Sequence, residues 1–99
     1  MPFEMVVGLT VSDDALYAKY REGMTPILAG YGGGFRHDFV VSKVLASESP
    51  HAINRVFAIS FPDRGARDAF YADPAYKAIR ARFFDASVTG RTIIAEYTR

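Results

Sequence analysis

The strand-like segments of this chain carry apolar residues on both faces, and this feature constrains its fold most strongly. Neighbouring residues of a strand point to opposite faces of a sheet, so two successive apolar residues place one on each face. Four segments each contain such a pair: Val6 with Val7, Val40 with Val41, Val56 with Phe57, and Ile93 with Ile94. This pattern indicates a sheet that is buried on both sides.

Strand and helix patterns follow one another in the order strand, helix, strand, strand, helix, strand. Helix starts are indicated at Ser12-Asp13-Asp14 and Pro62-Asp63, where a capping side chain precedes helical residues. The first helix is expected to end at Gly32-Gly33-Gly34, because glycine readily adopts the left-handed conformation there. A second cap within the second helical segment is expected at Asp73-Pro74. The expected strands are Phe3–Val11, Phe35–Leu45, Asn54–Phe61 and Val88–Tyr97.

This order predicts an α+β fold, the ferredoxin-like βαββαβ arrangement with a four-stranded antiparallel sheet. The 99 residues suffice for one domain over 1–99. Two helical segments can cover only one face of such a sheet. The second apolar face is most simply covered by the same sheet of another copy, so we expect a homodimer assembled through the sheet face.

Charge and composition exclude several classes of partner. Twelve basic and eleven acidic residues are interspersed along the chain and give a net charge of +1, so neither nucleic acid nor a membrane is an expected partner. The N-terminal apolar run is broken too early for a signal peptide or a membrane span. We therefore expect a cytoplasmic protein.

No cofactor or metal is expected. The chain has no cysteine, and its two histidines are far apart in sequence, so a structural zinc site is not expected. The glycine-rich run Gly30–Gly34 follows a helix and precedes a strand. A dinucleotide- or phosphate-binding loop needs the opposite order, because the phosphate rests on the helix that follows the loop.

His37 and Asp38 are the candidate catalytic residues. A histidine titrates near neutral pH and can act as a general base. Asp38 is its neighbour on an expected strand, so the two side chains point to opposite faces and do not form a dyad within one chain. The alternative for His37 is a partly buried strand residue that is hydrogen-bonded to the backbone. His51 falls in the expected loop Ala46–Ala52, where we expect it to be solvated.

Arg55, Asn54, Tyr20 and Tyr31 are the candidate substrate-binding residues. A guanidinium at Arg55 can bind a carboxylate with two hydrogen bonds. A regular hairpin would place Arg55 near Lys43 or Leu45, and pairing with Glu48 or with an acid of a partner chain is the structural alternative. Both tyrosine rings fall on the apolar face of the first helix, and their hydroxyls are expected to reach a cavity between helix and sheet.

The chain also resembles a known family over nearly its whole length. The resemblance is carried, in this order, by Tyr20-Arg21, Pro26-Ile27-Leu28, Tyr31-Gly32-Gly33-Gly34-Phe35, Asn54-Arg55-Val56-Phe57, Phe61-Pro62-Asp63, Phe70-Tyr71, Asp73-Pro74, Tyr76 and Ile79-Arg80. These segments are similar to the bacterial "domain of unknown function 1330" family. The resemblance implies membership of the dimeric α/β-barrel superfamily, in which two ferredoxin-like sheets close into one barrel.

The function implied by this resemblance is broad. The superfamily includes cofactor-independent monooxygenases and isomerases as well as ligand-sensing domains, and fold alone does not choose among them. We expect a protein that binds or transforms a small organic molecule in a pocket near the sheet. The alternative is a non-catalytic dimeric domain that senses a ligand or mediates an interaction.

Overall fold

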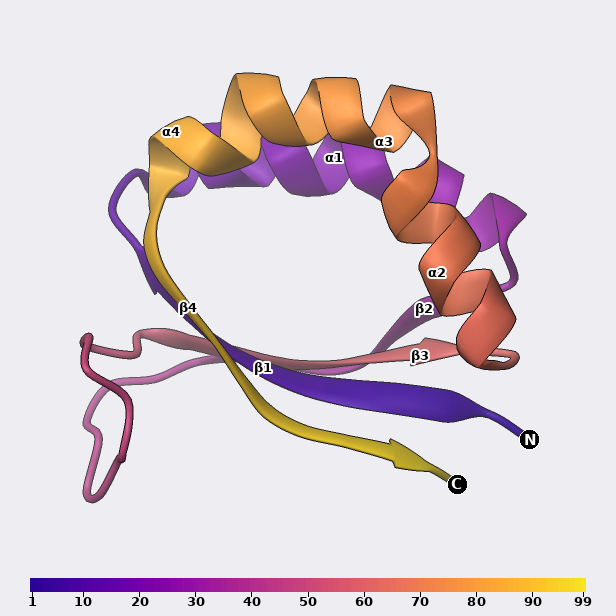
Figure 1. Cartoon of the computed structure of the whole chain (residues 1–99). Helices are drawn as coiled ribbons and strands as arrows, with labels where there is room; N and C mark the ends of the chain where they lie inside the picture. Colours follow the sequence, from indigo (N-terminus) through magenta and orange to yellow (C-terminus); the bar gives the residue numbers. More distant parts are fainter.

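The computed structural model describes all residues, 1–99, and shows one sheet with helices on one side (Figure 1). The expected α+β order is confirmed, and the second helical segment is divided into several parts. The elements are β1 (Phe3–Val11), α1 (Asp14–Gly30), β2 (Gly34–Val40), β3 (Arg55–Phe61), α2 (Arg64–Ala72), α3 (Pro74–Ile79), the π-helical turn η1 (Arg80–Phe84), α4 (Asp85–Ser87) and β4 (Val88–Thr98).

The four strands form an antiparallel sheet in the order β2-β3-β1-β4, as a ferredoxin-like fold requires. The central strand β1 pairs along its length with both β3 and β4. Met5, for example, lies between Ile59 of β3 and Glu96 of β4. The order of elements and the sheet topology are therefore those that the sequence predicts.

The helices cover one face of this sheet, which we call the inner face. Along β1 the inner side chains are Phe3, Met5, Val7 and Leu9, and all four are buried. They pack with buried residues of the helices in one core, because both elements present an apolar stripe to each other. The main helical members of this core are Tyr17, Tyr20, Met24, Leu28, Phe70 and Tyr76.

The opposite side of the sheet, which we call the outer face, has no helix over it (Figure 1). Strand alternation and register place Val6, Phe39 and Val56 there. Ile94 is unpaired at an irregularity of β4 and lies on the same side, near Val56 and Gly8. Phe39 and Ile94 are largely exposed. Both faces of the sheet therefore carry apolar side chains, as the pairs of apolar residues in the sequence predict.

The second strand is shorter than expected. It ends at Val40 instead of Leu45, and the segment from Val41 to Asn54 forms a long loop. This loop extends beyond the outer side of the sheet (Figure 1). Val44 and Leu45 are exposed, because they have left the ladder in which alternation would have directed their side chains.

The expected cap at Asp73 is confirmed. Its carboxylate accepts hydrogen bonds from the backbone N–H groups of Ala75 and Tyr76, at 2.8 and 3.1 Å. This separates α2 from α3 and turns the chain so that Tyr76 reaches the core. No helix in the structure is long and apolar enough to cross a membrane.

Candidate functional site

Two of the six predicted site residues, Asp38 and Arg55, are held together on the inner face. Asp38 lies near the end of β2, and Arg55 begins β3, the neighbouring strand. The Nε and Nη2 atoms of Arg55 donate to the two carboxylate oxygens of Asp38, each at 2.8 Å. The expectation that Arg55 lies near Lys43 or Leu45 is wrong, because the long loop makes Val40 its partner in the ladder.

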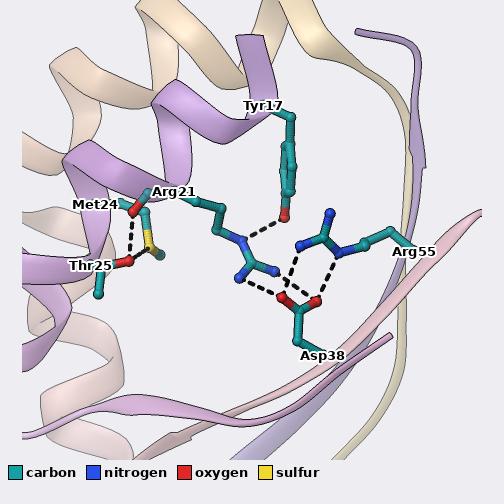
Figure 2. A network of polar contacts seen from close by, with 6 residues as sticks. All are labelled: Tyr17, Arg21, Met24, Thr25, Asp38 and Arg55. Carbon is teal, nitrogen blue, oxygen red and sulfur yellow. Dashed lines mark hydrogen bonds and ion pairs between the residues drawn. The ribbon is translucent and has the colours of Figure 1, made fainter. Parts of the chain in front are cut away.

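A second guanidinium, that of Arg21, reaches Asp38 from α1. Its Nη1 and Nη2 atoms donate to the carboxylate at 3.1 and 3.3 Å, and its Nε donates to the Tyr17 hydroxyl at 2.8 Å (Figure 2). The Arg21 guanidinium also lies 3.8 Å from the centre of the Phe35 ring. These contacts fix its position, because the fork of donors and the aromatic face constrain it from two directions.

The charges of this cluster stabilise one another. Burial raises the pKa of Asp38, but the hydrogen bonds from Arg55 and the positive charges of Arg21 and Arg55 outweigh it and hold the pKa below its ordinary value. The hydrogen bonds with Asp38 raise the pKa of Arg55. Asp38 is therefore an ionised acceptor at neutral pH and a weak base.

The cluster lies at the wall of a cavity of about 450 Å³ between α1 and the inner face. We call this cavity the Tyr17 cleft. It is open at one side and combines charged groups with small apolar surfaces. Its lining residues are Asp14, Tyr17, Ala18, Arg21, Asp38, Val40 and Arg55.

His37 lies on the other side of the sheet. It is an exposed residue of the outer face, and its ring stacks on that of Phe39 at a centroid distance of 5.8 Å. The prediction that His37 and Asp38 point to opposite faces agrees with the structure. His37 does not line the Tyr17 cleft.

Asn54, Tyr20 and Tyr31 also lie outside the cleft, and their polar groups are engaged elsewhere. The Asn54 amide bonds both the N–H and the carbonyl of Val11, at 2.8 and 2.9 Å. The Tyr20 hydroxyl meets that of Tyr76 in the core at 2.9 Å. The Tyr31 hydroxyl donates to Asp73 at 2.7 Å. Each bond ties two elements together.

Tyr17 and Arg21 are site residues that the sequence analysis missed. A signal was present, since Asp14, Tyr17, Ala18 and Arg21 follow the three- and four-residue spacing of one helix face. Tyr17 of this face belongs to the core, whereas Arg21 is turned toward Asp38 near the end of β2. Only the packing of α1 on the sheet shows that it meets Asp38.

A second hollow lies on the outer face, under the loop from Val41 to Asn54. Its volume is about 770 Å³, and eight of its thirteen lining residues are hydrophobic. It is bounded by loop residues such as Val44 and Leu45 and by the strand residues Val56 and Ile94. It holds none of the six predicted site residues.

His51 fastens this loop to the sheet, which differs from the expected solvated position. Its two ring nitrogens bond the hydroxyls of Thr10 and Thr92, each at 2.7 Å. The ring lies so close to Gly90 that a Cβ atom there would be 2.4 Å from His51 Cγ. Glycine at position 90 thus permits the close approach of the histidine.

Comparison with known families agrees with this architecture. The model of the family described as "Domain of unknown function (DUF1330)" matches residues 5–97, and the chain belongs to this family. A search of curated proteins finds no significant match.

Several solved structures share the fold. The RPA0582 protein of unknown function from Rhodopseudomonas palustris has a TM-score of 0.81 and 18% identity, over 99% of this chain and 82% of its own. A dimeric ferredoxin-like protein of unknown function from Jannaschia sp. CCS1 has a TM-score of 0.60 and 17% identity, over the full length of both chains. SnoaB, a cofactor-independent oxygenase from Streptomyces nogalater, has a TM-score of 0.65 and 16% identity, over 99% of this chain and 92% of its own. The ferredoxin-like fold is confirmed.

Proposed function

We propose that this protein binds a small organic molecule in the Tyr17 cleft and works as a homodimer assembled through its outer face. The observation that carries the binding proposal is the group of Arg21, Asp38 and Arg55 at the wall of the cleft. Ionisable residues held in a fixed geometry beside an open cavity are typical of binding sites. The apolar surfaces of Ala18 and Val40 would contact the body of the ligand.

The cleft supports binding more directly than catalysis. A cofactor-independent isomerase or monooxygenase needs a group that takes a proton from its substrate. The cleft holds no histidine, and Asp38 is kept ionised by two arginines. The similarity to SnoaB, at 16% identity, shows the fold alone. A non-catalytic ligand-sensing role needs only binding and assembly, and both proposed features would serve it.

The binding proposal is tested by screening a library of small acidic, basic and neutral compounds by two-dimensional NMR. We expect ligands to shift the amide signals of Tyr17, Asp38 and Val40. Replacing Arg55→Leu should weaken their binding about 10- to 100-fold, because bonds to a charged group are lost. Arg67→Leu is the matched control, since Arg67 forms ion pairs with Asp68 and Glu96 outside the cleft.

Two results of this screen would count against the proposal. One is a library without any compound that shifts signals of the cleft. The other is equal loss of binding in the Arg55 and Arg67 variants, which would indicate a general effect of losing an arginine. Turnover of a bound compound in the presence of air, followed by mass spectrometry, would instead favour the enzymatic alternative.

The homodimer proposal is supported by the uncovered outer face. Phe39 is 57% exposed and Ile94 is 51% exposed, on the face without helices. Large apolar side chains grouped on one face are typical of an interface. A dimer through this face would also cover the Val6 and Val56 side chains and complete the burial that the strand pattern indicates.

Analytical ultracentrifugation tests this assembly. We expect a dimer for the natural chain and a folded monomer for Phe39→Glu, because a charge would be buried without a partner. Ala29→Glu places the same charge on the exposed surface of α1 and should leave the dimer intact. A natural chain that stays monomeric at high concentration would refute the proposal.

A further inference from the structure

The Tyr17 cleft has hydrogen-bond donors that no protein group accepts. A guanidinium carries five N–H donors. Arg55 uses Nε and Nη2 on Asp38, whereas its Nη1 has no acceptor in the protein. In Figure 2 this third nitrogen carries no dashed line and points away from Asp38. Both N–H groups of Arg55 Nη1 are thus free beside the cavity.

The Tyr17 hydroxyl is a second such donor. Its oxygen accepts from Arg21 Nε at 2.8 Å, but its own hydrogen has no acceptor in the protein. The residue as a whole is buried and belongs to the core, but it also lines the cleft. Burial raises the pKa of this hydroxyl, which the nearby arginines only partly offset. It therefore stays protonated at neutral pH and can donate.

The acceptors of the cleft are already used. Both oxygens of Asp38 accept from Arg21 and Arg55, so this carboxylate is engaged by four donor contacts. The cluster of two guanidiniums and one carboxylate carries a net charge of +1. Asp14 on the first turn of α1 is the one other charged residue of the lining, and it is exposed and forms no ion pair. The cleft is rich in donors and lacks a free inner acceptor.

We propose that the ligand of this cleft is a small organic acid whose carboxylate accepts from the Tyr17 hydroxyl and from Arg55 Nη1. This inference rests on the proposed binding function and specifies its ligand class. A carboxylate has two oxygens and a negative charge, which match one neutral and one cationic donor. The short apolar wall of Ala18 and Val40 and the volume of about 450 Å³ suit an acid with a compact apolar body.

Pairs of acids and their amides test the ligand class. A panel of substituted benzoates, phenylacetates and 2-oxo acids is titrated by NMR beside the corresponding primary amides, which have nearly the same shape and no charge. We expect the acids to bind in the cleft at least about 10-fold more tightly than their amides. The acids, but not the amides, should also bind less tightly as salt is raised from 20 to 300 mM, values chosen to span about 20 to 6 Å of screening length.

Single-site variants test the donors. Tyr17→Phe removes only the hydroxyl and should weaken the acids about 5- to 10-fold while leaving the amides less affected. Tyr20→Phe is the matched control, since it removes a buried hydroxyl of the same helix that does not line the cleft. Asp14→Asn should strengthen binding of the acids, because it removes a negative charge from the rim.

The outcomes separate the two proposals. If the amides bind the cleft as well as the acids, or if Tyr17→Phe and Tyr20→Phe have equal effects, the organic-acid inference is overturned and the binding function stands. If neither this panel nor the wider library shifts cleft signals, both proposals fail. Acid selectivity that is lost in Tyr17→Phe and kept in Tyr20→Phe supports the inference.

Discussion

Each face of the sheet holds a carboxylate bound by two arginines, and the two clusters differ in where their charges lie. Asp38 on the inner face is bound by Arg21 and Arg55, whose side chains are 15% and 24% exposed. Glu4 on the outer face is itself 3% exposed, below Arg36 and Arg99, which are 45% and 38% exposed. The inner cluster thus fixes its cations beside a cleft, whereas the outer cluster covers its anion and leaves its cations at the surface.

This difference shows what helix cover does to a charged group. On the inner face, α1 and the aromatic rings immobilise the guanidinium of Arg21, so that donors are fixed in a defined geometry. On the outer face the guanidiniums remain free to adjust to solvent or to a second copy. We therefore propose ligand recognition at the inner cluster and assembly at the outer face, and three experiments test this division.

The largest effect is expected from removing matched phenylalanines of the two faces. Phe61 on the inner face is 1% exposed, in contrast to the exposed Phe39 of the outer face. Phe61→Ala should lower the free energy of unfolding by about 3–5 kcal/mol, because it leaves a cavity in the core. Phe39→Ala should change the stability of the isolated protomer by at most about 0.5 kcal/mol.

Urea unfolding at low protein concentration measures both changes, and the concentration dependence of the transition reports the dimer. Phe39→Ala should make the transition depend less on protein concentration. Phe61→Ala should lower stability and leave this concentration dependence unchanged. If the two variants lost the same protomer stability, the helices over the inner face would not explain the difference between the faces.

A smaller effect is expected from neutralising the two carboxylates. Asp38→Asn should cost about 1.5–3 kcal/mol, since it breaks charged hydrogen bonds to two largely buried guanidiniums. Glu4→Gln should cost less, about 0.5–1.5 kcal/mol, because the amide oxygen can still accept a hydrogen bond and the two half-exposed arginines can be solvated in the variant. Unfolding in urea at pH 7 compares the two. If Glu4→Gln cost more than Asp38→Asn, the outer cluster would be the more constrained of the two.

The smallest effect is the loss of these contributions in acid. The pKa of Glu4 is lowered mainly by the hydrogen bond from Tyr97 and then by Arg36, and that of Asp38 is lowered by its arginines against the effect of burial. A carboxylate with a lowered pKa stabilises the fold above its unfolded value and stops doing so as pH falls through the folded value. Stability should therefore decline below the ordinary values of 4.5 for Glu4 and 3.8 for Asp38.

Unfolding curves between pH 7 and pH 2.5 check this sign. Asp38→Asn should flatten the decline below pH 3.8 and leave the part between pH 4.5 and 3.8 in place, whereas Glu4→Gln should flatten both parts. A decline that is unchanged in both variants would mean that other carboxylates dominate the acid response.

Local patterns were sufficient to predict most of the fold. The caps at Asp63 and Asp73, the stop at the glycine run before Phe35, and the alternation along β1 each act over a few residues, so each could be read from the sequence. The end of β2 could not, because Val41 to Leu45 look like strand but leave the ladder. Whether an apolar segment pairs depends on the neighbouring strand and not on its own residues.

The site was predicted only in part, for a similar reason. Asp38 and Arg55 were identified by residue type, whereas Tyr17 and Arg21 were not among the predicted site residues. Tyr20, Tyr31 and Asn54 were chosen for their polar groups, and each of these groups has a partner that is distant in sequence. The partners of a polar side chain are a property of the folded chain.

The order of elements, the two-sided apolar character of the sheet and the family could all be predicted from the amino-acid sequence. Which of His37 and Asp38 enters the cleft could not, because it depends on the pairing of β2 with β3. Regular alternation from the inward-facing Phe35 would have turned His37 inward, but β2 has a bulge at Arg36, so that His37 pairs with Ala58 and Asp38 with Phe57. One extra residue in a strand moves the side chain of every later residue to the opposite face of the sheet. Such a bulge depends on how β2 fits β3, since the local pattern of apolar and polar residues is compatible with either register.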